Sequence, residues 1–223
     1  MDIIDDAMKD IVIFGAGGLS KEVASLIGRI NEIEGDKWKI VGFFDDDISL
    51  KGKSVSHFGK VLGGVEELNA WSKPIDVAIA IGNPNAIRKV RERLDSPYLS
   101  FPNIISPDFM IADNQCFNIG EGNIIQRGCV ASNDVLIGNY NLFNGDIVMG
   151  HDVEVGNYNV LMPDIRVSGE VIIGEGNLIG VGSIILQQIK IGKNVHIGAG
   201  AVLMTKPKDG STYLGNPAKL FKF

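Results

Sequence analysis

Cysteine and histidine are scarce in this sequence, and their scarcity limits the chemistry that the chain can perform. The 223 residues include two cysteines, Cys116 and Cys129, and three histidines. Two cysteines cannot form a disulfide framework, and no CxxC or CxxxH cluster is present to bind a metal ion. We therefore expect neither a disulfide-stabilised fold nor a metal site.

Basic charge and long apolar runs are lacking as well. Lysine and arginine number 21 against 27 aspartate and glutamate residues, which leaves a net charge of −6. Without a basic surplus to neutralise phosphates, we expect no nucleic-acid partner, although a few backbone N–H groups can hold a single anionic ligand. No apolar run approaches 18 residues, and the opening "MDIIDDAMKD" is acidic where a signal peptide is basic. These features predict a cytoplasmic protein without membrane insertion, whose first eight or so residues form a loose leader.

Residues 9 to about 100 alternate between expected strands and helices. Short apolar runs within 10–15, 37–47 and 76–82 are typical of buried strands. Between them, 17–30 has apolar residues at helical spacing, and 83–94 begins with an asparagine and a proline that suit a helix N-cap and first turn. The alternation predicts a small parallel α/β unit.

From Ile119 onward the pattern changes to a period of six residues. Every sixth residue from 119 to 203 is apolar, a run of fifteen that chance produces with a probability below about 10⁻⁵ at 45% apolar content. Eight of the fourteen residues that directly follow positions 119 to 197 are glycine. This period fits neither a heptad nor an α-helix. It is typical of a hexapeptide β-helix, in which each hexad supplies one short strand and one turn.

The second half resembles the left-handed parallel β-helix of the hexapeptide acyltransferases, in which three hexads form one triangular coil of 18 residues. From residue 10 to its end, the chain resembles the bacterial sugar acetyltransferases that include UDP-4-amino-sugar N-acetyltransferases and sialic acid O-acetyltransferase-like proteins. The closing "YLGNPAKLF" is similar to that superfamily's "GNPAK" ending. The resemblance implies a Rossmann-like nucleotide-sugar-binding domain at 9–104, followed at 105–223 by a left-handed β-helix acyltransferase domain with a C-terminal tail.

His151 lies in a turn of the repeat, within "MGHDVEVG". At 18 residues per coil, Gly169 stacks one coil beyond it, at an inter-strand spacing of roughly 4.8 Å. A glycine there predicts an empty notch beside the imidazole, whose backbone N–H could bind a thioester oxygen. Asp152 could hold one ring nitrogen so that the other stays an acceptor. The resemblance implies the same roles, with His151 as general base and Asp152 as its supporting carboxylate.

The resemblance also implies two ligand sites. Backbone contacts to the co-substrate acetyl-CoA fall on Gly169, Val181 and Ala199. The glycine loop "GAGGLS" follows the first expected strand and opens a helix, so its N–H groups can approach an anion. Contacts to a nucleotide-sugar fall on this loop and on the ends of the next strands, at Gly17, Gly18, Leu19, Asp45, Asp46 and Gly82.

Two positions depart from the resembled pattern. Val160 stands where many relatives have a second histidine that helps to hold the donor, and Leu19 stands where relatives often have a histidine. Asn144, in the turn before His151, is a further candidate for orienting the acceptor. We assign no role to the other two histidines, His57 and His196.

Together with the residues above, the resemblance implies an acetyl-CoA-dependent N-acetyltransferase that modifies an amino group of a nucleotide-activated amino sugar in bacterial surface-glycan biosynthesis. No cysteine or serine neighbours the histidine, so we expect direct transfer without a covalent acyl-enzyme. Two alternatives stay open: O-acetylation of a sugar hydroxyl, with a sialic acid-like acceptor, and a non-catalytic β-helix scaffold. We also expect a homotrimer whose active sites lie between neighbouring β-helices.

Overall fold

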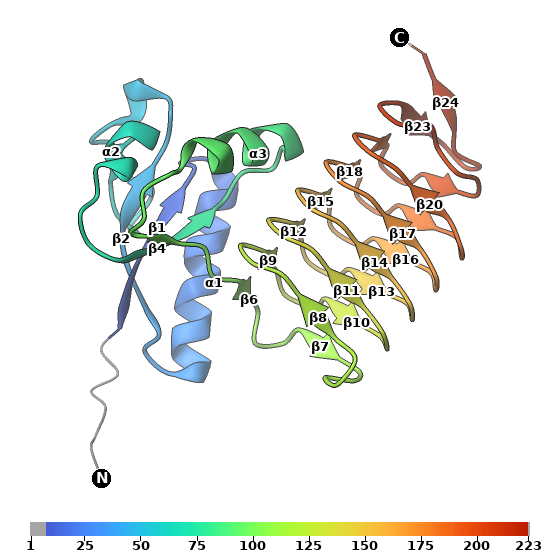
Figure 1. The fold of residues 1–223 in the computed structure, drawn as a ribbon, viewed down its shortest axis with the longest axis horizontal. Coiled ribbons are helices and arrows are strands. Elements are labelled where there is room, and N and C mark those ends of the chain that lie inside the picture. The colour runs from blue at the N-terminus through green and yellow to red at the C-terminus, as the bar shows by residue number, and fades with distance from the viewer. Residues whose placement is uncertain (1–7, 223) are drawn as a thin grey trace.

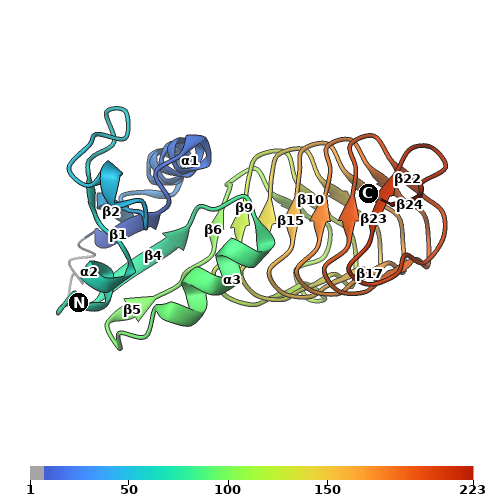
Figure 2. The same cartoon turned by 90° about the horizontal axis from the view of Figure 1, so that it is seen from above.

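The computed structural model describes residues 8–222, and its first part is a parallel sheet in the strand order β3-β2-β1-β4-β5. The strands are β1 (Lys9–Phe14), β2 (Trp38–Phe44), β3 (Val61–Gly63), β4 (Ile75–Ile79) and β5 (Leu99–Ser100). The helices are α1 (Gly18–Glu34), α2 (Val65–Asn69), α3 (Pro84–Arg93) and the 3₁₀ helix η1 (Ile48–Leu50). Helices α1 and α3 lie on opposite sides of the sheet (Figure 2). Residues 1–7 of the expected leader lie outside the described residues.

The strands β1, β2 and β4 and the helices α1 and α3 occur where the sequence predicts them. Asn83 caps α3, since its side chain accepts a hydrogen bond from the amide of Ala86 at 3.0 Å. The short elements β3, α2 and β5 were not predicted, because two to five residues carry too little periodicity to identify them. None of the helices in the described range 8–222 is long and apolar enough to cross a membrane.

The second part is a parallel β-helix with three flat faces, and its coils run away from the first sheet (Figure 1). Face 1 is an eight-stranded sheet of β6 (Ile104–Ile105), β9 (Ile124–Ile125), β12 (Leu142–Phe143), β15 (Val160–Leu161), β18 (Leu178–Ile179), β21 (His196–Ile197), β23 (Thr212–Leu214) and the antiparallel β24 (Lys219–Phe221). Face 2 is a six-stranded sheet of β7 (Met110–Ile111), β10 (Val130–Ala131), β13 (Val148–Met149), β16 (Arg166–Val167), β19 (Ile184–Ile185) and β22 (Val202–Leu203). Face 3 is a five-stranded sheet of β8 (Asn118–Ile119), β11 (Leu136–Ile137), β14 (Glu154–Val155), β17 (Ile172–Ile173) and β20 (Lys190–Ile191).

The strand register confirms the 18-residue coil. Val148 pairs with Arg166 and Met149 with Val167, and the other faces repeat this shift. The second residue of each two-residue strand from β8 to β22 is one of the fifteen hexad positions, and it points into the β-helix. These inward side chains form a continuous apolar core, which explains why the period is strict.

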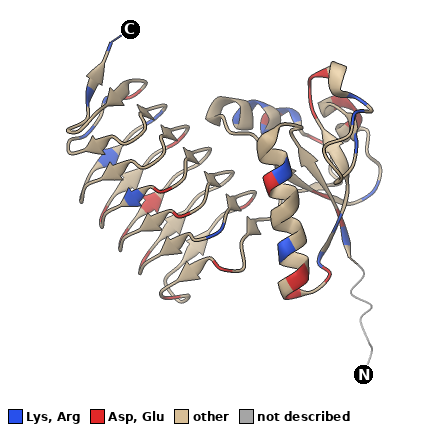
Figure 3. Cartoon of the chain, turned by 180° about the vertical axis from the view of Figure 1, so that it is seen from behind, with Lys and Arg blue, Asp and Glu red and all other residues tan. Residues whose placement is uncertain are grey.

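Three rows of turns join the faces. We name them by one coil: the first turn row contains 144–147, between faces 1 and 2; the second contains 150–153, between faces 2 and 3; the third contains 156–159, between faces 3 and 1. Charged residues are sparse on the faces, where most strands are tan in Figure 3. Most charged groups of the β-helix therefore lie on the turn rows.

A ladder of buried asparagines stabilises the third turn row. Asn123, Asn141, Asn159 and Asn177 follow one another at 18-residue spacing, and each is at most 1% exposed. The side-chain amide of each later member donates to the side-chain oxygen of the one before it, at 2.9 to 3.0 Å. The ladder satisfies buried polar groups that an apolar core could not.

The first sheet packs against face 1 and the third turn row. The outward residues Leu142 and Val160 of face 1 are buried in one apolar cluster with the sheet and its helices. From α3, Arg91 donates to the hydroxyl of Tyr140 at 2.6 Å, and Arg88 lies 3.6 Å from Glu175. Burial at this junction raises the pKa of Tyr140. Because the N-terminal part covers face 1, the second turn row is the edge of the β-helix opposite to it.

Candidate active site

His151 and Asp152 form a hydrogen-bonded pair in the second turn row, directly after β13. The Nδ1 atom of the imidazole lies 2.6 Å from Oδ2 of Asp152. Asp152 adopts a left-handed backbone with φ 55°, and its amide donates to the carbonyl of Asn133 one coil earlier at 3.0 Å. When Nδ1–H donates to this carboxylate, Nε2 keeps its lone pair and can accept a proton.

Gly169 lies directly against this imidazole. A methyl group at position 169 would be 2.5 Å from Nε2 of His151, so the ring occupies the space that a side chain would need. The expected empty notch is therefore filled by the ring itself, and Gly169 is buried beneath it. The amide of the next residue, Glu170, donates to the carbonyl of His151 at 2.8 Å and ties the two coils together. The N–H of Gly169 has no acceptor within residues 8–222.

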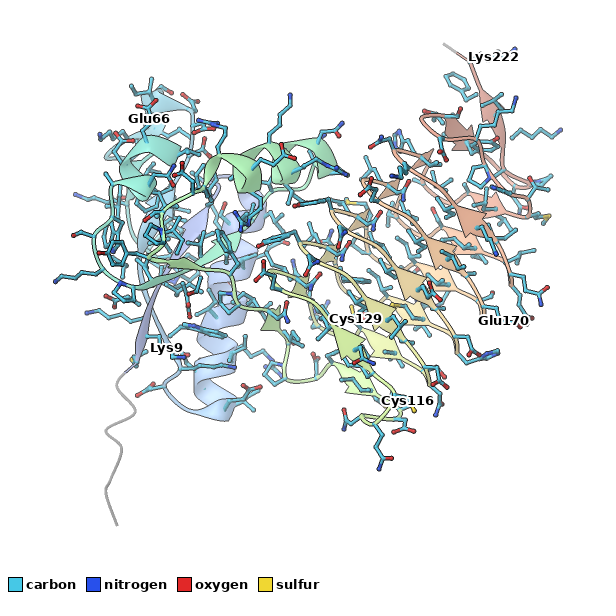
Figure 4. The ribbon with its side chains drawn as sticks, viewed as in Figure 1. Lys9, Glu66, Cys116, Cys129, Glu170 and Lys222 are labelled. Carbon is cyan, nitrogen blue, oxygen red and sulfur yellow. The ribbon has the colours of Figure 1, made fainter. Side chains whose placement is uncertain are left out.

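An acidic surface adjoins the pair on the side of face 3. Glu170 stacks one coil beyond Asp152, and hydrogen bonds from Gln187 and Gln188, with the nearby His151, hold the pKa of its carboxyl below the usual range. A hollow of about 300 Å³ beside Asp152 is lined by Cys116, Asn118, Asp134, Leu136, Asp152 and Glu154. Figure 4 shows Glu170 and Cys116 in this row of turns, on the side away from α3. The acidic surroundings favour a cationic group, such as a protonated amine, near the base.

The sequence reasoning missed this acidic column. Cys116, Asp134, Asp152 and Glu170 follow one another at 18-residue spacing. The same arithmetic that pairs His151 with Gly169 could have found them.

Val181 and Ala199 lie in the first turn row, one coil apart and exposed. The N–H of Ala199 has no acceptor in the described part of the chain. This row and the second turn row are the two edges of face 2, so one protomer does not bring Ala199 and Gly169 together. Val160, at the place of the histidine found in relatives, is fully buried against the first sheet and is closed to a ligand.

The glycine loop lies at the carboxyl edge of the first sheet. Gly17 is the N-cap residue of α1, and both Gly17 and Gly18 are exposed, with open space where their side chains would be. Gly82 follows β4 at the same edge and is also exposed. Leu19 is half-buried and packs against the apolar core. Ligands of open parallel α/β sheets bind at this edge, where α1 also directs its N-terminal N–H groups.

Asp45 and Asp46 follow β2 at the same edge, but both carboxylates already have partners. Asp45 accepts from the amides of Ala16 and Asp47, each at 2.9 Å, and so fixes the glycine loop. Asp46 forms an ion pair with Arg93 at 2.5 Å. Both line a hollow of about 340 Å³ that extends to Gly64 and Glu67.

The remaining candidates lie apart from these groups. Asn144 is buried in the first turn row, where its side chain donates to the carbonyl of Leu161. His196 is exposed on face 1 near the C-terminal end of the β-helix, and His57 contacts Ser56 in a loop of the first part. Among the described residues, no group of three or more His, Cys, Asp or Glu side chains is placed to hold a metal ion.

Comparisons with known proteins agree with this architecture. Residues 10–94 match the PglD N-terminal domain, and residues 170–204 match the bacterial transferase hexapeptide of six repeats. The acetyltransferase domain of PglB from Neisseria gonorrhoeae FA1090 shares 30% identity and a TM-score of 0.85, over 96% of this chain and 100% of that one. Its structure is also known in complex with acetyl coenzyme A. No protein of curated function matches the sequence significantly.

Two further structures are similar over nearly the whole chain. PerB from Caulobacter crescentus, solved in complex with CoA and GDP-perosamine, has 25% identity and a TM-score of 0.81, over 97% of this chain and 99% of its own. WeeI from Acinetobacter baumannii AYE has 25% identity and a TM-score of 0.83, over 96% and 100%. A Rossmann-like sheet followed by a left-handed hexapeptide β-helix, as predicted, defines a class of acyltransferases. Within that class, the chain belongs to the hexapeptide-repeat sugar acetyltransferases with a PglD-type N-terminal domain.

Proposed function

We propose that the chain is an acetyl-CoA-dependent N-acetyltransferase that acts in the cytoplasm on the amino group of a nucleotide-activated amino sugar, for bacterial surface-glycan synthesis. The observation that carries the proposal is the His151–Asp152 pair, with Nε2 of the ring over Gly169. Acetyl coenzyme A bound to the PglB domain and GDP-perosamine bound to PerB support the two substrate classes.

The chemistry follows from the geometry of the pair. Nε2 of His151 takes a proton from the attacking amine, while Asp152 holds Nδ1 and stabilises the imidazolium that forms. The amine nitrogen bonds to the thioester carbon, and the N–H of Gly169 binds the oxygen as it becomes negative. When the intermediate collapses, the C–S bond breaks and the imidazolium returns its proton to the leaving thiolate.

The location of the donor argues for a homotrimer. Gly169 lies on one edge of face 2, whereas Val181 and Ala199 lie on the other. If face 2 of each protomer is turned toward a threefold axis, the second turn row of one β-helix meets the first turn row of the next. A donor held between them would contact all three residues, two of them from the neighbouring protomer.

The exposed surface of face 2 supports this assembly. Exposed apolar side chains gather on its upper strands and edges, at Val181, Ile184, Leu186 and Met204, with exposures between 38 and 46%. The side chains of His151 and Asp152 are 55 and 58% exposed in one protomer. A neighbour would cover the apolar patch and exclude water from the base.

We propose a division of labour between residues 9–104 and 105–223. The nucleotide-sugar would bind the N-terminal part, with its phosphates at Gly17 and Gly18 and with Leu19 and Gly82 beside them. Asp45 would act mainly by fixing the loop, and Asp46 by lining the hollow beside β2 and β3. Acetyl-CoA would bind the β-helix.

Turnover assays test the proposal directly. The protein is incubated with acetyl-CoA and matched UDP-, GDP- and CMP-sugars that carry either an amino or a hydroxyl acceptor. Thermal shifts rank the sugars first, because a bound ligand raises the melting temperature by mass action. An alkali-stable amide product supports N-transfer, and a labile ester supports the O-acetyltransferase alternative. No product with any sugar, in a protein that nonetheless binds acetyl-CoA, supports a non-catalytic scaffold.

A further inference from the structure

The backbone N–H groups of Gly169 and Ala199 lie on opposite edges of face 2. Neither donates a hydrogen bond to any residue within 8–222, and the equivalent residues of the preceding coil, His151 and Val181, share this vacancy. Both groups are therefore free to donate to a ligand, and what distinguishes them is the glycine beneath each peptide bond.

Each of these N–H groups belongs to a peptide bond that rests on a glycine of the preceding coil. A methyl group on Gly150 would lie 2.8 Å from the nitrogen of Gly169 and 2.9 Å from the carbonyl carbon of Ser168. On Gly180 it would lie 2.6 Å from the nitrogen of Ala199 and 2.7 Å from the carbonyl carbon of Gly198. Real methyl groups do not approach so closely, so any larger residue would displace the peptide bond that carries the vacant donor.

The glycines of the third turn row differ in this respect. A methyl group on Gly156 would meet the carbonyl oxygen of Gly174 at 2.4 Å, and one on Gly174 would meet that of Gly192 at 2.3 Å. Both oxygens accept hydrogen bonds from the asparagine ladder. Among the described glycines, Gly150 and Gly180 are the two whose methyl group would meet a backbone nitrogen first.

We propose that Gly150 and Gly180 are positioning residues for the acyl donor, each of which sets one peptide N–H against one carbonyl oxygen of that donor. Gly150 places the N–H of Gly169 for the thioester carbonyl beside His151. Gly180 places the N–H of Ala199 for an amide carbonyl of the pantetheine arm, on the opposite wall of the same groove. The inference rests on the function proposed above, and it adds two residues that contact neither the donor nor the base.

Two unreactive donor analogues separate the two roles. Acetyldethio-CoA has a ketone in place of the thioester, and S-ethyl-CoA lacks the carbonyl. Calorimetry of the wild-type protein should show about 5- to 10-fold tighter binding of the ketone, as one net hydrogen bond allows. Gly150→Ala should lose this preference and keep its affinity for S-ethyl-CoA. Gly180→Ala should bind both analogues more weakly, by about 5- to 10-fold, and keep the preference.

Gly156→Ala is the matched control, because it creates a similar backbone clash away from both donors. It should lower the melting temperature as the other two variants do and leave both affinities unchanged. An NMR measurement on the wild-type protein does not depend on whether the variants fold. With ¹⁵N-labelled glycine and alanine, acetyldethio-CoA should shift the amide signals of Gly169 and Ala199, and S-ethyl-CoA that of Ala199 alone.

The outcomes separate this inference from the proposed function. A wild-type protein that binds neither analogue would overturn the proposed function. Suppose that wild type binds the analogues but Gly150→Ala and Gly180→Ala keep its preference and affinities, or that the amide signals of Gly169 and Ala199 do not move. Either result would overturn the positioning role and leave the proposed function standing.

Discussion

The Nε2 atom of His151 lies over Gly169, in the space where a side chain at position 169 would begin. The ring is therefore held from two sides, by Asp152 at Nδ1 and by the bare backbone beneath Nε2. One glycine thus fixes the direction of the proposed base and brings the vacant N–H donor beside it.

Gly169→Ala should lower kcat without unfolding the protein. The added methyl group would lie 2.5 Å from Nε2 and 2.7 Å from Cε1, so the ring must turn away and lose its alignment with the acceptor. We expect kcat to fall by about 10- to 100-fold, because misplacement by about 1 Å can cost that much. The melting temperature of Gly169→Ala, compared with that of Gly156→Ala, shows whether the variant keeps its fold. Unchanged kcat would show that the position of the ring does not matter.

His151→Ala and Asp152→Asn should differ in the size of their effects. Removing the base should lower kcat/KM by about 10²–10³, which corresponds to about 3–4 kcal/mol of transition-state stabilisation. Asp152→Asn should cost less, because it weakens the orientation of the ring and leaves the base in place. For N-transfer, raising the pH should recover part of the His151→Ala loss, since solution supplies more neutral amine. Little recovery by about pH 9 would favour a hydroxyl acceptor, which depends more heavily on the base.

The β-helix and the place of the His151 turn within it could be predicted, because the hexad period puts an inward side chain at every sixth residue. Stacking at 18 residues then predicts that Gly169 lies beside His151. The position of the imidazole could not be predicted, since it depends on a rotamer choice and on the Asp152 contact. The burial of Val160 could not be predicted either, because a local sequence pattern does not show which face of the β-helix the first sheet covers. The partners of Asp46 were missed for the same reason, since Arg93 is distant in sequence.

Asn159→Ala should destabilise the β-helix. Asn159 is fully buried, and its side-chain amide donates to the side-chain oxygen of Asn141 and to the carbonyl of Gly174. Its side-chain oxygen accepts from the backbone N–H and from the side-chain amide of Asn177, both at 2.9 Å. Truncation leaves several buried groups without partners, which should cost about 2–4 kcal/mol. Urea unfolding at fixed protein concentration measures the loss. Asn118→Ala, at an exposed strand position, should change the free energy of unfolding by less than about 0.5 kcal/mol. Equal stabilities of the two variants would contradict the role of the ladder.

Glu175→Gln should weaken the junction between α3 and the β-helix in a pH-dependent way. Lys193 and Arg88 hold the pKa of Glu175 below its model-peptide value of 4.5. A depressed pKa stabilises the folded state above pH 4.5, and this stabilisation is lost as the pH falls through the folded value. The variant should therefore be less stable than wild type at pH 7, by about 1 kcal/mol or less for such a partly exposed pair. The difference in the free energy of unfolding between Glu175→Gln and wild type should shrink toward pH 3. The control Glu32→Gln on α1 should have the same stability as wild type at both pH values.

The final prediction concerns which protomers build one active site. Face 1 carries the proposed sugar-binding part, and His151 lies on the opposite edge, so the sugar of one protomer should meet the histidine of its neighbour. Gly17→Val should abolish sugar binding and leave acetyl-CoA affinity intact, because open space at Gly17 lets the fold accept the side chain that blocks the ligand. His151→Ala should keep about 1% of wild-type turnover or less, as argued above.

Co-expression of these two inactive variants at equal amounts tests the arrangement. In a mixed trimer, an active site forms wherever a protomer with an intact glycine loop faces a neighbour with an intact histidine. Random assembly gives this combination at about one site in four, so about a quarter of wild-type activity should return. Light scattering should show a trimer throughout. A mixture as inactive as its parents would place the sugar and the histidine in the same protomer, and a fully active monomer would rule out the shared site altogether.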